Sequence, residues 1–177
     1  MKKLILVIDI QKEYIANGRP YYIKSIESSL EKAQAVLQAA RANKIPVWHV
    51  QHKQDGSIFA KDSALVDFIP GFEPLNNEPI FIKDMYSCFS SADFSQSVAK
   101  QRPEEIIIIG YGTAKCCLCT IIDGIHRGFK FKLIEDACAA VGAKHADEAQ
   151  MHLSAINILK QYADVVDANS LIHTIKN

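Results

Sequence analysis

The stretch IIIIGYGT at residues 106–113 decides the fold of this chain. Its four consecutive isoleucines leave no polar alternation, so the strand that they predict is covered on both faces. Strands of this kind belong to parallel sheets, whose crossover helices shield both sides. The rest of the chain therefore has to supply further strands and the helices between them.

Short runs rich in isoleucine and valine do recur on both sides of this stretch, with amphipathic segments between them. Two such segments, 26–42 and 149–162, carry apolar residues at helical intervals. Alternating strands and helices predict a doubly wound, three-layer α/β domain of the Rossmann-like type over residues 1–177. The predicted strands are 4–8, 46–51, 80–82, 106–109, 130–134 and, more weakly, 164–167.

Residues 54–78 interrupt this rhythm with glycines, prolines and a pair of asparagines. This composition predicts a long loop with one short helix at 62–68. Long loops in compact domains often belong to a functional site. The apolar side chains of the loop are expected either to cover a pocket or to form an interface between subunits; these are Ile58, Phe59, Phe68, Ile69 and Phe72.

Charge and cysteine content narrow the class of partner. In 177 residues, 20 basic side chains balance 20 acidic ones, which argues against a nucleic-acid binder and favours a small neutral or weakly charged partner. No apolar run is long enough to span a bilayer, so no membrane partner is expected. The number of cysteines is odd, 5, and three lie within four positions, which indicates reduced thiols and a cytoplasmic location.

Three chemically capable residues follow predicted strands: Asp9, Lys83 and Cys116. Open α/β sheets bind ligands beyond the carboxyl ends of their strands, where the strand order reverses. Cys116 is expected in the first turn of the next helix, where unpaired N–H groups and the helix dipole favour a thiolate. Lys83 would lower the thiol pKa further, and Asp9 would take the proton. Together with backbone N–H groups for an oxyanion, the trio predicts an amidase-type site.

The other cysteines leave an alternative open. Cys117 and Cys119 are expected to be packing residues, but Cys116 and Cys119 also form a C-x-x-C pair. That spacing is typical of thiol-disulfide chemistry, so a redox sensor is a competing interpretation. Structural zinc is disfavoured, because no second cysteine pair exists and His126 has no matching ligand pair.

With these motifs in place, the chain resembles the isochorismatase-like cysteine hydrolases, which include nicotinamidases and N-carbamoylsarcosine amidohydrolases. The first strand of that family ends in Asp-x-Gln, as at Asp9 and Gln11, and its lysine motif, Lys-x-x-Tyr-Ser-x-Phe, matches residues 83–89. The nucleophile motif falls on Gly110, Thr113, Cys116, Thr120, Asp123 and Gly128, and further matches are Asp136, Ala137 and His152.

The resemblance implies a six-stranded parallel sheet and a catalytic triad of Asp9, Lys83 and Cys116. It also implies a cis peptide between Tyr111 and Gly112 and an oxyanion hole made by the backbone N–H groups of Gly112 and Cys116. The expected substrate is a small amide, ureido or related C–N compound that is opened through a thioester, with no cofactor. A homo-oligomer, either a dimer or a tetramer, is also expected. Candidate pocket residues are Gln11, Tyr14, His52, Tyr86 and Phe89.

The chain also departs from the family pattern. Ala114 stands where many relatives have an acidic or amide residue, so detailed specificity does not transfer. Nicotinamidases bind a metal through Asp-x-His after the second strand, whereas this chain reads His52-Lys53-Gln54, so no metal is expected. His52 is interpreted as a pocket-edge or hydrogen-bonding residue, and Trp48 as strand packing. Vinyl ether hydrolysis and a catalytically silent binding module remain alternatives.

Overall fold

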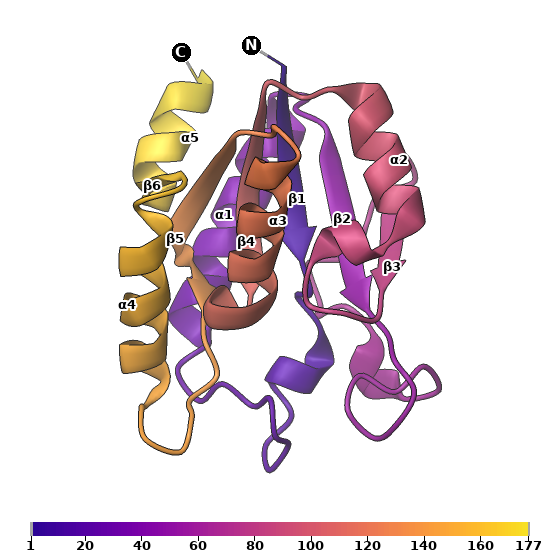
Figure 1. Cartoon of the computed structure of the whole chain (residues 1–177), viewed down its shortest axis with the longest axis vertical. Coiled ribbons are helices and arrows are strands. Elements are labelled where there is room, and N and C mark those ends of the chain that lie inside the picture. The colour runs from indigo at the N-terminus through magenta and orange to yellow at the C-terminus, as the bar shows by residue number, and fades with distance from the viewer. Residues whose placement is uncertain (1, 177) are drawn as a thin grey trace.

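The computed structural model describes residues 2–176 and contains a six-stranded sheet in which all neighbouring strands are parallel (Figure 1). The strand order is β3-β2-β1-β4-β5-β6, so it reverses between β1 and β4. This confirms the predicted sheet and places the expected ligand edge at the carboxyl ends of β1 and β4. The strands are β1 Lys3–Ile8, β2 Val47–His52, β3 Ile80–Lys83, β4 Glu105–Tyr111, β5 Phe131–Ala139 and β6 Asp164–Val166.

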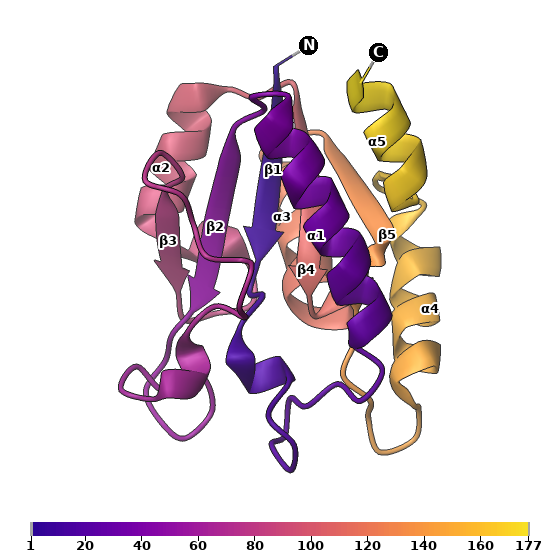
Figure 2. The same ribbon diagram turned by 180° about the vertical axis from the view of Figure 1, so that it is seen from behind.

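Helices cover both faces of the sheet, which confirms the three-layer architecture. Helices α1 (Glu27–Ala42) and α5 (Ala168–Lys176) pack on one face (Figure 2). The opposite face carries α2 (Ala92–Gln101), α3 (Leu118–His126) and α4 (Glu148–Leu159) (Figure 1). Within residues 2–176, no helix has the length and hydrophobicity that crossing a membrane would require.

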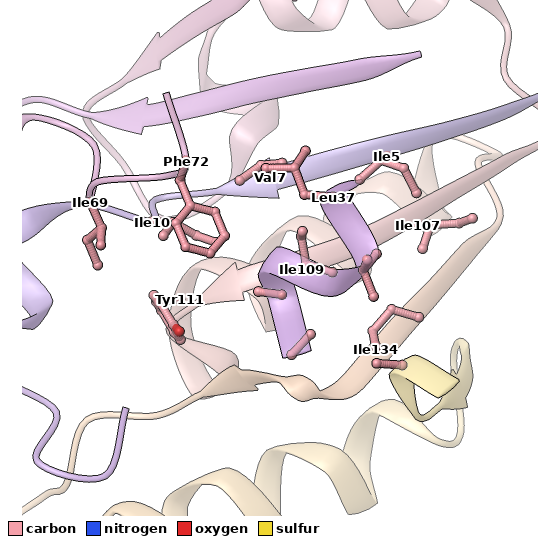
Figure 3. Packing of buried hydrophobic residues seen from close by; sticks show 14 of the residues in the cluster. Ile5, Val7, Ile10, Leu37, Ile69, Phe72, Ile107, Ile109, Tyr111 and Ile134 are labelled. Carbon is pink, nitrogen blue, oxygen red and sulfur yellow. The ribbon is translucent and has the colours of Figure 1, made fainter. Parts of the chain in front are cut away.

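The two cores follow from the alternation of side chains along the central strands. Ile5 and Val7 of β1 face α1, where they pack with Leu37, Ile107 and Ile109 (Figure 3). Leu4, Leu6 and Ile8 point to the other face and join the core beneath α2, α3 and α4. Because both faces are buried, these strands are apolar at nearly every position. The uninterrupted isoleucine run is explained in this way.

Several predicted boundaries were wrong: β4 runs to Tyr111 rather than to residue 109, and α4 ends at Leu159 rather than at residue 162. Strand β5 does not end at residue 134 but continues to Ala139, after a register shift opposite residues 108–110 of β4. The shift accommodates the partly exposed Glu135 and Asp136 before the strand pairs again. The predicted helix at 62–68 is a single 3₁₀ turn, η2 (Ala64–Val66), since the chain is already extended at Asp67.

The loop at residues 54–78 packs on the chain itself. Phe59, Ile69 and Phe72 are buried in the core beneath α1, so they do not form an exposed interface. The side chain of Gln11 holds the loop to the sheet: its Nε2 donates to the carbonyls of Val66 and His52, at 2.6 and 3.0 Å. Its Oε1 accepts the backbone N–H of His52 at 2.8 Å. The side-chain amide of Gln11 therefore forms three hydrogen bonds to backbone groups, and these bonds join the end of β1 to β2 and to the loop.

Glu78 anchors the far end of the same loop. Its carboxylate accepts hydrogen bonds from Arg41 of α1 at 2.8 and 2.7 Å, and from the backbone N–H of Leu75 at 3.0 Å. His49 Nε2 of β2 lies 2.9 Å away. Burial raises the pKa of Glu78, but the hydrogen bonds from Arg41, Leu75 and His49 outweigh it and hold the pKa at about 2. The loop is thus tied to both α1 and β2.

Gly110 is the residue that lets β1 and β4 approach at the point of reversal. It pairs with Ile8 and has a φ of +127°. A Cβ at this position would lie 2.0 Å from the Ile8 carbonyl oxygen. Only glycine fits, because the neighbouring atom is backbone and the left-handed region disfavours side chains.

Gly110→Ala should lower the free energy of unfolding by about 3 kcal/mol or more, because both the clash and the backbone strain oppose the native contact. Gly18→Ala is the matched control: its φ is +80°, but no atom of residues 2–176 beyond its chain neighbours lies within 4 Å of the added carbon. Strain alone should cost the control about 1 kcal/mol. Urea unfolding of both variants measures the difference. If both variants lost the same small amount of unfolding free energy, the close approach of Gly110 to the Ile8 carbonyl would not be what requires glycine at this position.

Candidate active site

The structure brings Asp9, Lys83 and Cys116 together at the reversal of strand order. Asp9 directly follows β1, Lys83 is the last residue of β3, and Cys116 lies just after β4. Lys83 Nζ is 2.7 Å from Asp9 Oδ2 and donates to Cys116 Sγ at 3.3 Å. All three residues are almost completely buried. A base, a cation and a thiol therefore share one small site.

Lys83 keeps its positive charge despite its burial. Burial lowers its pKa, but the carboxylate of Asp9 raises it more, so the pKa lies above its ordinary value. An ammonium fixed beside the sulfur can stabilise a thiolate when one forms.

Cys116 lies on an unexpected turn. It was predicted in the first turn of an α-helix, but residues Thr113–Cys117 form a π-helical segment before α3. The carbonyl of Gly112 accepts the N–H groups of both Lys115 and Cys117, at 3.0 and 3.2 Å, and the second bond is the wide i→i+5 type. The Tyr111–Gly112 peptide is cis. The turn presents the sulfur toward the carboxyl ends of β1 and β3.

The resting thiol is neutral. Burial raises the pKa of Cys116 most, the Asp9 carboxylate raises it further, and Lys83 lowers it, with a net value well above the ordinary one. Oδ1 of Asp9 is buried and accepts no hydrogen bond from any group within residues 2–176. Carboxylate and sulfur atoms of these two residues lie within 4.8 Å of each other. Asp9 thus offers a free acceptor beside a thiol that has a proton to give.

His52 is a member of this cluster that sequence reasoning left without a partner. Lys83 Nζ donates to its Nδ1 at 2.9 Å, and its Nε2 is 3.0 Å from Gln54 Oε1. An ammonium can only donate, so Nδ1 accepts and Nε2 carries the hydrogen. Burial, and then Lys83, lowers the pKa of His52, which keeps it neutral. The signal that the sequence offered was that His52 and Lys83 each directly follow a predicted strand, at 46–51 and 80–82.

Asp9, His52 and Cys116 also form a donor set that could hold a metal ion. However, Lys83 Nζ contacts a donor atom of each residue, at 2.7, 2.9 and 3.3 Å. The ammonium therefore takes the position that a cation would need, and these residues do not fit a metal while Lys83 is charged.

An aromatic wall encloses the site on the side of the 54–78 loop. The ring centroid of Phe59 lies 4.9 Å from the ring centroid of His52 and 5.4 Å from that of Tyr14. Tyr21 extends the wall, with its ring 5.2 Å from Phe59 and 6.0 Å from Tyr14. Burial raises the pKa of Tyr14, and the nearby Cys116 and Asp9 raise it further. Phe59 and Tyr21 were not predicted as site residues.

The remaining predicted pocket residues differ in position. Tyr86 is 44% exposed at the outer side of the site, and a hydrogen bond with Tyr21 is the first cause that raises its pKa. Phe89 instead belongs to the core beneath α2 and α3, where it packs against Phe94 and Phe129 at 5.1 and 5.6 Å. The ring of Phe89 therefore packs in the core. The amide of Gln11, another predicted pocket residue, instead holds the 54–78 loop to the sheet.

Other residues of the nucleophile motif hold the parts of the site together. Ser87 donates to Asp123 Oδ2 at 2.7 Å, and the backbone N–H of Cys88 donates to Thr120 Oγ1 at 3.0 Å. These bonds tie the segment after Lys83 to α3. Thr113 Oγ1 lies 2.9 Å from His152 Nδ1 of α4.

All five cysteines are free thiols. Cys117 points to the sheet, with its Sγ 3.7 Å from the Gly110 carbonyl, and a hydrogen bond with Cys138 is the first cause that raises its pKa. Cys119 is partly exposed and lies outside both core clusters. Cys117 is therefore a packing residue as predicted.

Comparison with known proteins shows which family and which solved structures this chain is similar to. Residues 3–170 match the family model of the isochorismatase domain. The isochorismatase family protein YddQ of Bacillus subtilis (strain 168) is 28% identical over 84% of this chain and 83% of its own length. Nicotinamidase 3 of Arabidopsis thaliana is 22% identical over 94% of this chain and 85% of its own length. The crystal structure of a cysteine hydrolase from Pseudomonas syringae pv. phaseolicola 1448A has a TM-score of 0.90 at 27% identity, covering 99% of this chain and 92% of that one.

Asp9→Asn should shift the alkylation of Cys116 to lower pH. The substitution removes a negative charge that raises the thiol pKa and leaves the Lys83 ammonium beside the sulfur, so the thiolate forms more readily. Lys83→Met should shift the profile to higher pH. Iodoacetamide labelling over a pH series, localised by mass spectrometry, measures both shifts.

Cys119 is the internal reference for Asp9→Asn, because Asp9 is not among the causes that shift its pKa. An unchanged or raised midpoint for Cys116 in a folded Asp9→Asn variant would contradict the charge arrangement described above.

Proposed function

Because the chain belongs to the isochorismatase family of hydrolases, whose members include amidases, we propose that it hydrolyses a small amide, ureido or related C–N substrate through a covalent thioester. The observation that carries this proposal is the contact of Lys83 with both Asp9 and Cys116, at 2.7 and 3.3 Å. Asp9, Lys83 and Cys116 form the proposed triad.

The first half of the reaction acylates the cysteine. Asp9 takes the thiol proton, and Lys83 stabilises the thiolate during the transfer. The sulfur attacks the carbonyl carbon, a C–S bond forms, and the C=O electron pair moves to oxygen. The backbone N–H groups of Gly112 and Cys116 bind that oxyanion. When the intermediate collapses, the C–N bond breaks, and the proton held by Asp9 passes to the leaving nitrogen.

The second half releases the acyl group. Asp9 accepts a proton from water as the water oxygen attacks the thioester carbonyl. The C–S bond then breaks, the sulfur regains a proton from Asp9, and the carboxylic or carbamic acid leaves. Asp9 thus carries one proton in each half, while Lys83 remains an ammonium throughout.

Cys116→Ala should lower kcat by at least about 10³-fold and abolish the covalent adduct, because no other group in the site can form the thioester. Cys117→Ala and Cys119→Ala should leave both nearly unchanged. Turnover and intact-protein mass spectrometry on a panel of small amides and ureido compounds measure this.

Two results would favour the alternatives. Equal damage from Cys119→Ala, with a reversible disulfide to Cys116, would support a redox sensor. Vinyl ether hydrolysis that survives Cys116→Ala would support isochorismatase-type chemistry, which needs no sulfur nucleophile.

We also propose that the protein is a cytoplasmic homo-oligomer, a dimer or a tetramer. The five free thiols are consistent with a reducing compartment. Ile80 and Ile82 point outward on the same side of the edge strand β3, 49% and 52% exposed, and Leu75 is 50% exposed. Apolar side chains on a sheet edge favour contact with a second chain.

Ile82→Asp should convert the oligomer to a monomer in size-exclusion chromatography with light scattering, because a charge would be buried in the contact. Leu153→Asp on α4 is the control, since Leu153 is 59% exposed on another element. A monomeric wild-type protein, or an Ile82→Asp variant that stays oligomeric, would contradict this assembly.

A further inference from the structure

Lys115 directly precedes the proposed nucleophile, and its side chain lies on the outer end of the aromatic wall. Its Nζ is 4.3 Å from the ring centroid of Tyr21 and donates to Tyr21 Oη at 3.2 Å. Its backbone N–H is held by the Gly112 carbonyl at 3.0 Å. The ammonium therefore extends from the same turn that presents Cys116, and a ring and a hydroxyl fix its position.

Among the residues that the structure describes, this ammonium has no acidic partner. Lys115 is partly buried, yet within residues 2–176 no carboxylate forms an ion pair with it. By contrast, the partly buried Arg41 is paired with Glu78 at 2.7 Å, and Lys132 with Glu105 at 3.2 Å. Tyr21 takes one of the three ammonium hydrogens, which leaves two for a ligand.

Lys115 is connected to the reacting centre by direct contacts. Tyr21 packs against Phe59, Phe59 covers His52, and His52 is hydrogen-bonded to Lys83. The exposed hydroxyl of Tyr86 joins Tyr21 at the outer end of this chain of contacts. One ammonium and two phenol hydroxyls thus form an outer rim at one end of this chain of contacts, and its inner end is Lys83 beside the cysteine.

Charge balance indicates which ligand this rim would bind. Asp9 and Lys83 neutralise each other at the inner end, and the resting thiol is uncharged. Among the charged side chains in this chain of contacts, Lys115 is therefore the one without an ion-pair partner within residues 2–176. A carboxylate would accept hydrogen bonds from the ammonium and the phenols, and charge-assisted bonds of this kind are among the stronger ones.

We infer that Lys115, with the hydroxyls of Tyr21 and Tyr86, binds a carboxylate of the substrate while the scissile C–N carbonyl lies at Cys116. The inference rests on the proposed function, because it takes Cys116 as the nucleophile. The substrate class is then a short ω-amido or ureido acid, and Lys115 determines specificity without taking part in bond cleavage.

The experiment compares short ω-amido acids (malonamate, succinamate and glutaramate) with the neutral diamides of the same length. Wild-type protein should prefer the acids. Lys115→Met should lower kcat/KM for the best acid by about 10- to 100-fold, mainly through KM, and leave its diamide nearly unchanged. Lys115→Arg should keep most of the preference. Lys100→Met, which removes the same charge from the distant last turn of α2, should change neither substrate.

A second readout separates this inference from the proposed function. Calorimetry in a Cys116→Ala background should show that the acid binds, and that adding Lys115→Met weakens binding by a similar factor. One result would overturn the proposed function but support the anion site. In that result, binding of the acid depends on Lys115, but Cys116 of the wild-type protein is never acylated. Equal losses for acid and diamide, or a wild-type preference for the diamide, would overturn the anion site and reduce Lys115 to packing on Tyr21.

Discussion

The buried ion pair between Lys83 and Asp9 is the interaction on which the site depends. Both side chains are fully buried, and their charged atoms are 2.7 Å apart. Removing one partner from such a pair leaves an uncompensated charge that costs several kcal/mol, so the two charges must be buried together. This requires β1 and β3 to end at the same edge of the sheet, with His52 of β2 between them. A parallel sheet meets that requirement.

The sulfur reaches this pair because β4 is the other neighbour of β1. Their backbones approach closely at Gly110, where no side chain fits, and the chain then turns through the π-helical segment that carries Cys116. The bond between Ser87 and Asp123 fastens the segment after Lys83 to α3. Residues from three separate parts of the chain are thus held in one arrangement by backbone approach and by side-chain bonds outside the reacting atoms.

Burial also sets the chemistry. A buried thiol beside a carboxylate keeps its proton at rest, so in the proposed mechanism the thiolate forms only when substrate is present to be attacked. Lys83 and Asp9 balance each other's charge at the buried centre, while Lys115 lies at the outer rim without an ion-pair partner within residues 2–176. In the proposed function, bond cleavage takes place at this buried centre, and the inferred carboxylate site lies at the rim.

The sequence alone determined the parallel sheet, because uninterrupted apolar strands can be stable only when covered on both faces. It also identified Asp9, Lys83 and Cys116, since residues after parallel strands must meet at one edge. Only the tertiary structure decided the π-helical turn, the bond from Lys83 to His52 and the unpaired charge of Lys115. It also directed the ring of Phe89 into the core. The periodicity of apolar residues in the sequence encodes which face of a strand or helix a residue occupies. The contacts of Lys83, Lys115 and Phe89 depend instead on which distant segments of the chain become neighbours in the fold.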